Sequence, residues 1–448
     1  MGRILIKNAR IVNEKSVFVG SLLICGDTIV DIIPKGKSLP PTVDYTVDAR
    51  YMYLFPGIID DHVHFREPGL THKATMASES AAAAADGITT IFDMPNTIPP
   101  TTSINHLQDK YDIAAENCLV NHSFYFGATG NNLHLIENLD PGSVCGVKVF
   151  MGSSTGDMLL DDKELLIRLF KTSPVPIAAH CEDSSIINAN LAKYKTLLQG
   201  EEPDITCHPL IRSAEACYRS SALAIELAHQ TDARLHILHV STAKELELFQ
   251  DSPPDDKLIT AEVSPAHLMF HQDYYKTLGS RIKCNPAIKS KDDREALRNS
   301  LKSNKIDVVG TDHAPHLLNE KIGGSISAAS GMPILPYSLP SLLELHSLGY
   351  ISLTEIVQKM CHNPAIIFNI EKRGFIRKGY KADLVLVQEK EEVKTVSSSD
   401  ITNLCGWTPF EGMKFKWSVQ QTWVNGNRIY NDGEISKKHK GEKITFVR

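Results

Sequence analysis

Apolar and polar positions divide the chain into two β-rich ends and a long central region of different texture. Residues 1–53 alternate short β-prone runs with turns, and the runs cover residues 4–6, 10–12, 22–24 and 28–32. Residues 375–448 return to the same pattern, with short strands predicted over residues 382–387, 417–424 and 444–447. Between them, apolar segments of strand length alternate with polar or helical stretches. Eight of these segments predict strands, over residues 58–62, 88–94, 123–128, 147–151, 176–180, 235–240, 258–263 and 306–311.

Helical periodicity fills several of the intervals between these strands. The spacing of apolar residues predicts helices over residues 75–86 and 214–230. Ser290 and Asp293 form a capping pair ahead of a further predicted helix over residues 294–304.

Strand and helix units that alternate eight times predict an α/β fold, a parallel (β/α)8 barrel of the TIM type. A doubly wound open sheet is the alternative that the alternation alone leaves open. We predict that the barrel spans residues 54–374. Residues 1–53 and 375–448 are predicted to form together a small β-sandwich domain.

Composition narrows the class of protein. Hydrophobic residues make up 42% of the 448 residues and charged residues 22%, which is ordinary globular usage and excludes global disorder. A net charge of −6 gives no footprint for nucleic acid or an anionic membrane. The chain has no apolar run of membrane-spanning length, no signal-peptide pattern and no Cys-x-x-Cys pair among its nine cysteines. We therefore expect a cytoplasmic protein with reduced thiols.

Polar residues gather at the carboxyl ends of the predicted strands, where a (β/α)8 barrel carries its reactive groups. A His-x-His pair on a strand directs both imidazoles to one face, which is half of a zinc site. Each histidine alone could be a hydrogen-bonded core residue. Four histidines and one aspartate at strand ends that converge in space favour a metal site instead, and these residues are His62, His64, His180, His239 and Asp312.

Lys148 interrupts an apolar run over residues 147–151, where an unpaired ammonium would cost several kcal/mol to bury. Reaction of its amine with CO₂ would give a carbamate, which carries a negative charge and two oxygens. Such a group can bridge two metal ions, whereas an ammonium cannot.

The same strand ends carry a family resemblance. Asp61-His62-Val63-His64 opens a motif that continues to Gly69, and further matching motifs occupy residues 94–97, 180–183, 239–242, 285–286, 310–316, 363–365 and 379–384. Together they resemble the dihydroorotases among the cyclic amidohydrolases, from about residue 5 to about residue 430.

The resemblance implies a zinc enzyme of pyrimidine biosynthesis that reversibly closes N-carbamoyl-L-aspartate into dihydroorotate with loss of water. It implies two zinc ions per chain, with His62 and His64 on the first and His180 and His239 on the second. Asp312 would be the last ligand and the catalytic base. The resemblance also implies self-association into a dimer or larger assembly, and it allows a carbamoyltransferase partner.

Lys148 is implied to be the N6-carboxylated bridge between the two metals. Some dihydroorotases instead place an aspartate a few residues beyond this lysine. Here that region reads Gly152-Ser153-Ser154, which favours the lysine-bridged site. Glu182 and Asp183 are candidates to orient the metal-binding histidines as hydrogen-bond acceptors.

Specificity needs a separate prediction, because dihydroorotate carries a carboxylate that hydantoins and dihydropyrimidines lack. A guanidinium can hold a carboxylate with two parallel hydrogen bonds, and Arg66 follows the His-x-His pair on the same face. A surface ion pair with Glu67 is the alternative for Arg66. The resemblance adds Asn96 and His316 as carboxylate contacts, Asn285 as a ring contact, and Gly331 in a loop whose backbone meets the ring.

Two other functions remain open at this stage. One is another cyclic amidase, either a dihydropyrimidinase (hydantoinase) or an allantoinase, which the predicted carboxylate contacts disfavour. The other is a non-catalytic relative that keeps the barrel as a scaffold. Scaffold relatives usually lack metal ligands, whereas all six positions are filled here.

Overall fold

The computed structural model describes residues 2–152 and 158–448, so Ser153 and Ser154 lie outside the described residues. Parallel strands of the central region form two hydrogen-bonded arcs, with strand orders β6-β7-β8 and β9-β10-β11-β12-β13-β14. Their bounds are Ile58–Val63 (β6), Ile88–Asp93 (β7), Asn121–Phe124 (β8), Phe126–Gly127 (β9), Val147–Phe150 (β10), Ile177–His180 (β11), Leu235–Ile237 (β12), Ile259–Val263 (β13) and Val308–Val309 (β14).

The two arcs close into one barrel. Only Tyr125 separates β8 from β9, so these two segments occupy a single strand position. At the other junction, Val63 forms a parallel bridge with His313, and the His64 amide donates to the His313 carbonyl over 2.8 Å. Eight strand positions in closed sequence order confirm the predicted (β/α)8 barrel.

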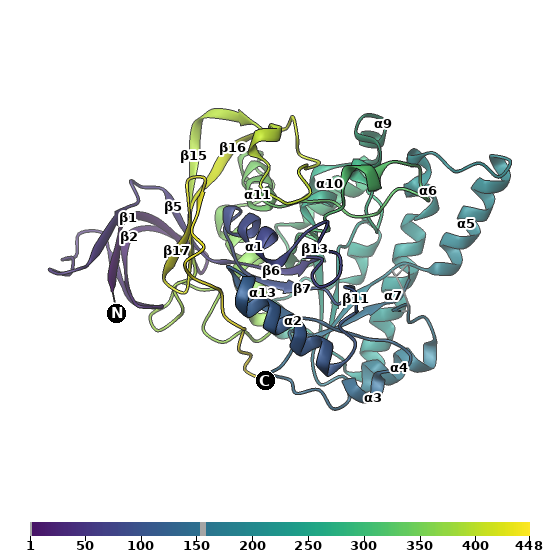
Figure 1. Ribbon diagram of the computed structural model, residues 1–448, viewed down its shortest axis with the longest axis horizontal. Coiled ribbons are helices and arrows are strands. Elements are labelled where there is room, and N and C mark those ends of the chain that lie inside the picture. Colours follow the sequence, from purple (N-terminus) through teal and green to yellow (C-terminus); the bar gives the residue numbers. More distant parts are fainter. Residues whose placement is uncertain (1, 153–157) are drawn as a thin grey trace.

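Strands from both chain ends join one nine-stranded sheet beside the barrel (Figure 1). The β5 and β15 strands pair antiparallel, with Leu54 opposite Leu386, so the two ends of the sequence meet at this ladder. Part of the sheet packs a core of its own, which includes Leu22 and Leu54, while other sheet residues, such as Phe55 and Val385, pack into the core of the barrel. Its strands are Arg3–Asn13 (β1), Ser16–Cys25 (β2), Thr28–Pro34 (β3), Tyr45–Asp48 (β4), Tyr53–Pro56 (β5), Leu384–Thr395 (β15), Lys414–Val424 (β16), Asn427–Asn431 (β17) and Glu434–Ile435 (β18).

The domain boundaries drawn from the sequence stay a prediction, but two expectations about the terminal strands need correction. Residues 4–6 and 10–12 belong to one strand, β1, and the break between them is a register shift from Ile6 to Ala9. Residues 444–447 were expected to form a strand, yet within them only Phe446 bridges, to Ile370. A β-prone run forms a strand only where it meets a partner along its length.

Helices alternate with the barrel strands along the chain and cover the outside of the barrel. The predicted helices over residues 75–86 and 214–230 correspond closely to α1 and α7. Ser290 and Asp293 form the predicted capping box, and the helix begins directly after the cap. The helices are Met76–Ala85 (α1), Ile104–Asn117 (α2), Leu133–Ile136 (α3), Lys163–Thr172 (α4), Ser184–Leu197 (α5), His208–Ile211 (α6), Ala214–Thr231 (α7), Pro265–Met269 (α8), Tyr275–Leu278 (α9), Lys291–Ser300 (α10), Ser338–Ser347 (α11), Leu353–Val357 (α12) and Asn363–Ile367 (α13).

None of these helices, in the ranges that the structure describes, is long and apolar enough to cross a membrane.

Candidate active site

One cavity of about 1040 Å³ opens at the carboxyl ends of the barrel strands. Every residue predicted for the site lines it: His62, His64, Arg66, Asn96, Lys148, His180, His239, Asn285, Asp312, His316 and Gly331. The barrel brings them together because they lie in its strands or in the segments between the strands and face the same mouth. Three of them, Arg66, His239 and Asp312, have positive φ angles of 66°, 40° and 49°, a conformation that non-glycine residues rarely adopt.

The first ligand group consists of His62, His64 and Asp312. Their inner atoms converge, because the two Nε2 atoms lie 3.3 and 3.2 Å from the same Asp312 oxygen, Oδ1. The outer nitrogens are already engaged: His62 Nδ1 donates to Glu262 over 3.0 Å, and His64 Nδ1 donates to Asn96 Oδ1 over 2.8 Å. Lone pairs of two imidazoles therefore face a carboxylate oxygen.

Such an arrangement of acceptors around one point fits a cation. Burial lowers the pKa of His62 and of His64 to about 4, so both rings are neutral, the form that binds metal. Although burial acts in the opposite direction, the neighbouring His62 and His64 lower the pKa of Asp312 well below its usual range. Ligands at about 2.1 Å from one tetrahedral ion stand about 3.4 Å apart, close to the separations here.

The second ligand pair is His180 and His239. Nδ1 of His180 faces Nε2 of His239 over 2.8 Å, while Nε2 of His180 contacts Glu182 Oε2 over 3.0 Å. Arg212 contacts the same glutamate. Burial raises the pKa of Glu182, but Arg212 and His180 together lower it to about 2, so the carboxylate is ionised. The contact to Glu182 leaves the Nδ1 lone pair of His180 directed inward.

Lys148 lies in β10 with 1% of its surface exposed, beside both ligand groups. Its ammonium stands 4.6 Å from the centre of the Phe150 ring. Burial lowers the pKa of Lys148 to about 7, against the opposing charges of Asp312 and Glu262. A substantial fraction of this amine is therefore uncharged at neutral pH, and the uncharged amine is the form that reacts with CO₂.

Donor groups gather on the neighbouring wall of the cavity. Arg66 Nη2 lies 3.0 Å from Nε2 of His316, and Lys73 Nζ lies 3.1 Å from Nδ1 of the same ring. Burial lowers the pKa of His316, and the two cations lower it further, so the ring is neutral. A neutral imidazole accepts at only one nitrogen, so one of the two cations lacks a proper acceptor in this contact. Lys73 also pairs with Glu320 over 2.7 Å.

The three remaining predicted contacts differ in their partners. Asn96 orients His64, as described above. Asn285 Oδ1 is buried and has no hydrogen-bond partner among the described residues, so it can accept from a ligand. Gly331 packs where a side chain would collide with the Ala314 carbonyl at 2.6 Å, and its amide donates to the Lys283 carbonyl. The Gly331 N–H is therefore engaged within the protein.

Several residues with clear roles in this geometry were not found from the sequence. Lys73 was missed because it follows the motif in a loop, where local pattern does not show what it faces. Glu262 was missed although it interrupts the apolar strand β13, the same signal that drew attention to Lys148. Two residues have other partners than those considered for them. Asp183 was a candidate to orient a metal-binding histidine, but its side chain caps helix α5. Glu67 was a candidate partner of Arg66, but its carboxylate accepts from the Met76 amide.

Comparison with known proteins identifies the family. The amidohydrolase family model matches residues 53–429. A dihydroorotase of Methanosphaera stadtmanae is 33% identical over 98% of both chains, and one of Ehrlichia canis is 34% identical over 94% of both. The chain belongs to the dihydroorotase family of amidohydrolases. Homology to dihydroorotases over nearly the whole chain supports a hydrolase that acts on cyclic amide bonds.

The fold of this dihydroorotase family member is shared with other cyclic amidases. The L-hydantoinase of Arthrobacter aurescens superposes with a TM-score of 0.93 at 26% identity, over 99% of this chain and 100% of that one. The overall fold therefore does not separate the two activities, and the residues that line the cavity must do so.

Proposed function

We propose that this chain catalyses the reversible cyclisation of N-carbamoyl-L-aspartate to (S)-dihydroorotate and water, a step of de novo pyrimidine biosynthesis. One observation carries the proposal. A cluster of acceptors suited to metal and a cluster of cationic donors suited to a carboxylate face the same cavity, and the substrate needs both.

We propose that two zinc ions occupy the ligand groups, with Lys148 carboxylated at Nζ as the bridge between them. His62 and His64 would hold one ion, His180 and His239 the other, and Asp312 would complete the set. Zinc in this setting supplies Lewis acidity and a nucleophile at neutral pH. The partners of the outer ring nitrogens, Glu262, Asn96 and Glu182, support the proposal because metal-binding histidines are oriented in this way.

Asp312 would transfer the proton in both directions. In ring opening, water attacks the ring amide carbon, and the Asp312 carboxylate accepts the proton that water loses. The bond from that carbon to the ring nitrogen breaks, and Asp312 gives the proton to the departing nitrogen. In ring closure the carbamoyl nitrogen attacks the side-chain carboxyl carbon, and water leaves. The pKa of Asp312 is lowered by His62 and His64, so its side chain is ionised at neutral pH, and the ionised form is the one that can accept a proton.

Arg66, His316 and Asn96 would bind the exocyclic carboxylate, and Lys73 adds a cation that the sequence did not predict. Asn285 would accept a hydrogen bond from a ring N–H. The donor cluster favours dihydroorotate over hydantoins and dihydropyrimidines, because an uncharged ring leaves the cations of Arg66 and Lys73 without an acceptor. The remaining parts of the proposal are self-association and a carbamoyltransferase partner, which follow the resemblance, and a cytoplasmic location, which follows the scattered cysteines.

The decisive experiment compares hydrolysis of dihydroorotate and dihydrouracil by the purified protein, with metal content measured on the same sample. Turnover of dihydroorotate alone, with about two metals bound per chain, is the expected result. Preference for dihydrouracil would replace the proposed substrate with that of a dihydropyrimidinase. Failure to turn over either compound in metal-loaded protein would favour the non-catalytic scaffold.

A further inference from the structure

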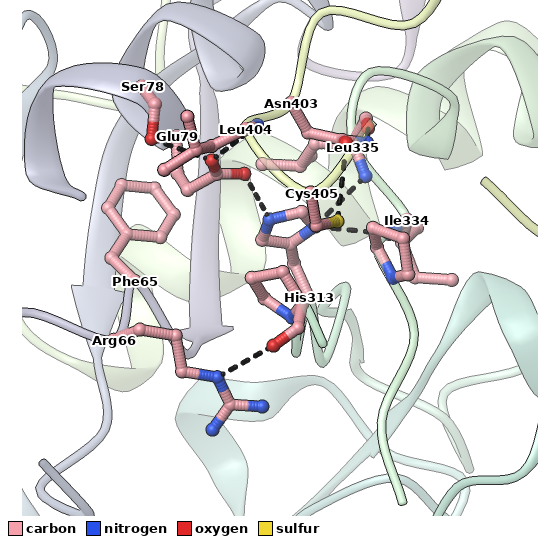
Figure 2. Close-up of polar contacts among 12 residues, drawn as sticks. Phe65, Arg66, Ser78, Glu79, His313, Ile334, Leu335, Asn403, Leu404 and Cys405 are labelled. Atoms are coloured by element: carbon pink, nitrogen blue, oxygen red, sulfur yellow. Dashed lines mark hydrogen bonds and ion pairs between the residues drawn. The ribbon is translucent and has the colours of Figure 1, made fainter. Parts of the chain in front are cut away.

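A buried hydrogen bond joins a histidine next to the proposed base to a glutamate of α1. His313, which follows Asp312 in the chain, places Nε2 2.7 Å from Glu79 Oε2, and both residues are 0% exposed. Glu79 lies in the first turn of α1, where a negative charge is favourable. Figure 2 shows the two side chains pointing toward each other, with Arg66 below them in this view.

The hydrogen bonds of this pair fix the tautomer of His313. Nδ1 accepts from the amides of Ile334 and Leu335 over 3.0 and 3.1 Å, so the ring proton must be on Nε2, where it is donated to Glu79. The other oxygen of Glu79 accepts from Ser78 Oγ at 2.8 Å and from the Leu404 amide at 3.2 Å. One carboxylate therefore ties α1, the end of the eighth barrel strand and the segment before β16 together.

The chain that carries Asp312 is held residue by residue. The His313 backbone closes the barrel against β6 through Val63 and His64, and its amide donates to Thr311 Oγ1. Each of the next three residues bonds to a different element. These contacts are Ala314 N to Met332 O (2.9 Å), Arg66 Nε to Pro315 O (3.1 Å) and Trp407 Nε1 to His316 O (2.7 Å).

Asp312 itself needs such support, because its φ of 49° lies in the left-handed region that non-glycine residues rarely occupy. We propose that Glu79, acting through His313, is a positioning residue that holds the Asp312 backbone in this conformation and aims its carboxylate into the site. The inference rests on the proposed function, in which Asp312 transfers the proton. Glu79 does not line the cavity, so its effect is expected on kcat and not on KM.

Glu79→Gln tests the inference with little change of shape. We expect kcat for dihydroorotate to fall by about 10- to 100-fold, the usual cost of losing an outer partner of a metal-site residue, with KM and metal content unchanged. Asp86→Asn is the matched control, because Asp86 ends the same helix, is equally buried and also accepts three hydrogen bonds, from Ser338 and Leu339. That control should lose stability and keep kcat.

A second variant shows whether Glu79 acts through His313. His313→Asn keeps an acceptor near the Ile334 and Leu335 amides but has no N–H that reaches Glu79. If the two residues act as a unit, adding Glu79→Gln to His313→Asn causes no further loss of kcat. Losses that multiply in the double variant would overturn the inference.

Nitrogen chemical shifts of His313 in the metal-free protein give a readout independent of activity. The expected state is a neutral ring protonated at Nε2, and Glu79→Gln should change the shift of that nitrogen. A ring protonated at Nδ1, or a kcat for Glu79→Gln equal to that of Asp86→Asn, would overturn the inference. Both results leave turnover by the unaltered protein intact, whereas failure of the proposed function would show as no turnover by that protein.

Discussion

The cavity has two walls of opposite character. The ligand wall consists of His62, His64, Lys148, His180, His239 and Asp312, and the donor wall consists of Arg66, Lys73 and His316. On the ligand wall, acceptor atoms face acceptor atoms, since the Nε2 atoms of His62 and His64 both point at one Asp312 oxygen. On the donor wall, cations face a ring that can accept from only one of them, since Arg66 and Lys73 approach the two nitrogens of His316. The first wall needs a cation and the second needs an anion.

This contrast teaches more than either wall alone. A metal site would suit any cyclic amidase, whereas a carboxylate site without metal would only bind its ligand. The two walls share their supports, because Arg66 follows His64 by two residues and His316 follows Asp312 by four. Two strand ends therefore carry both the proposed metal ligands and the proposed carboxylate contacts. Substitutions in the ligand wall should affect metal content and turnover, whereas substitutions in the donor wall should affect the preference for a charged substrate.

The largest effect is expected from Lys148→Ala, which should remove the bridge of the ligand wall. Metal and turnover should be lost together, because the remaining ligands no longer hold two ions at a fixed separation. A short-chain carboxylic acid should restore part of both by occupying the space of the carbamate. Metal analysis and dihydroorotate hydrolysis, with and without added acid, measure this result.

Lys359→Ala is the matched control for a buried lysine. Lys359 is 2% exposed, donates to the Ser303 and Ile306 carbonyls, and lies outside the cavity lining. Its removal should lower the unfolding temperature without loss of metal. Equal metal content in Lys148→Ala and Lys359→Ala would contradict a role of Lys148 in holding the metal ions.

Asp312→Asn should leave metal bound and lower kcat by about 10²- to 10⁴-fold, the range for loss of a general base. The amide keeps the shape of the side chain and an oxygen for the ligand wall, but it cannot accept the proton from water. Steady-state kinetics on metal-loaded protein measure the loss. Turnover near that of the unaltered protein would contradict the proposed role of Asp312 in proton transfer.

Much of the fold followed from local pattern. Apolar runs identified the barrel strands because parallel strands are buried on both faces, and caps such as Ser290 fixed helix ends. The run over residues 444–447 misled because Ile444 and Phe446 are buried without a continuous ladder partner, as the single Phe446 bridge shows. Whether a run pairs depends on contacts far along the chain, which local pattern does not contain.

The candidate site divides in the same manner. Residues on strands, such as His62 and His64, were predicted because a period of two fixes their direction. Lys73, Glu79 and Trp407 were not, because each acts across a gap of at least 90 residues, toward His316, His313 and His316. Only the closed barrel shows that these segments meet, so such partners cannot be predicted from motif spacing.

Arg66→Ala should weaken the donor wall and leave the ligand wall intact. We expect kcat/KM for dihydroorotate to fall by about 10- to 100-fold, since a hydrogen bond to a charged group is worth about 1.5–3 kcal/mol. Metal content and turnover of an uncharged hydantoin should change little. Arg66→Lys should recover only part of the loss, because an ammonium lacks the guanidinium fork. Equal losses on charged and uncharged rings would contradict the carboxylate clamp.

Lys73→Met should have the smallest effect. It measures how much Lys73 contributes, relative to Arg66, to binding of the substrate carboxylate. Lys73 is partly exposed and already paired with Glu320, so its attraction for a substrate carboxylate is screened. We expect KM for dihydroorotate to rise by about fivefold, equivalent to about 1 kcal/mol, with kcat and metal content unchanged. A loss as large as that of Arg66→Ala would make Lys73 an equal partner in the clamp. No change in KM would instead limit Lys73 to holding His316 and Glu320 in place, and the anion would then be bound by Arg66 with the neutral groups around it.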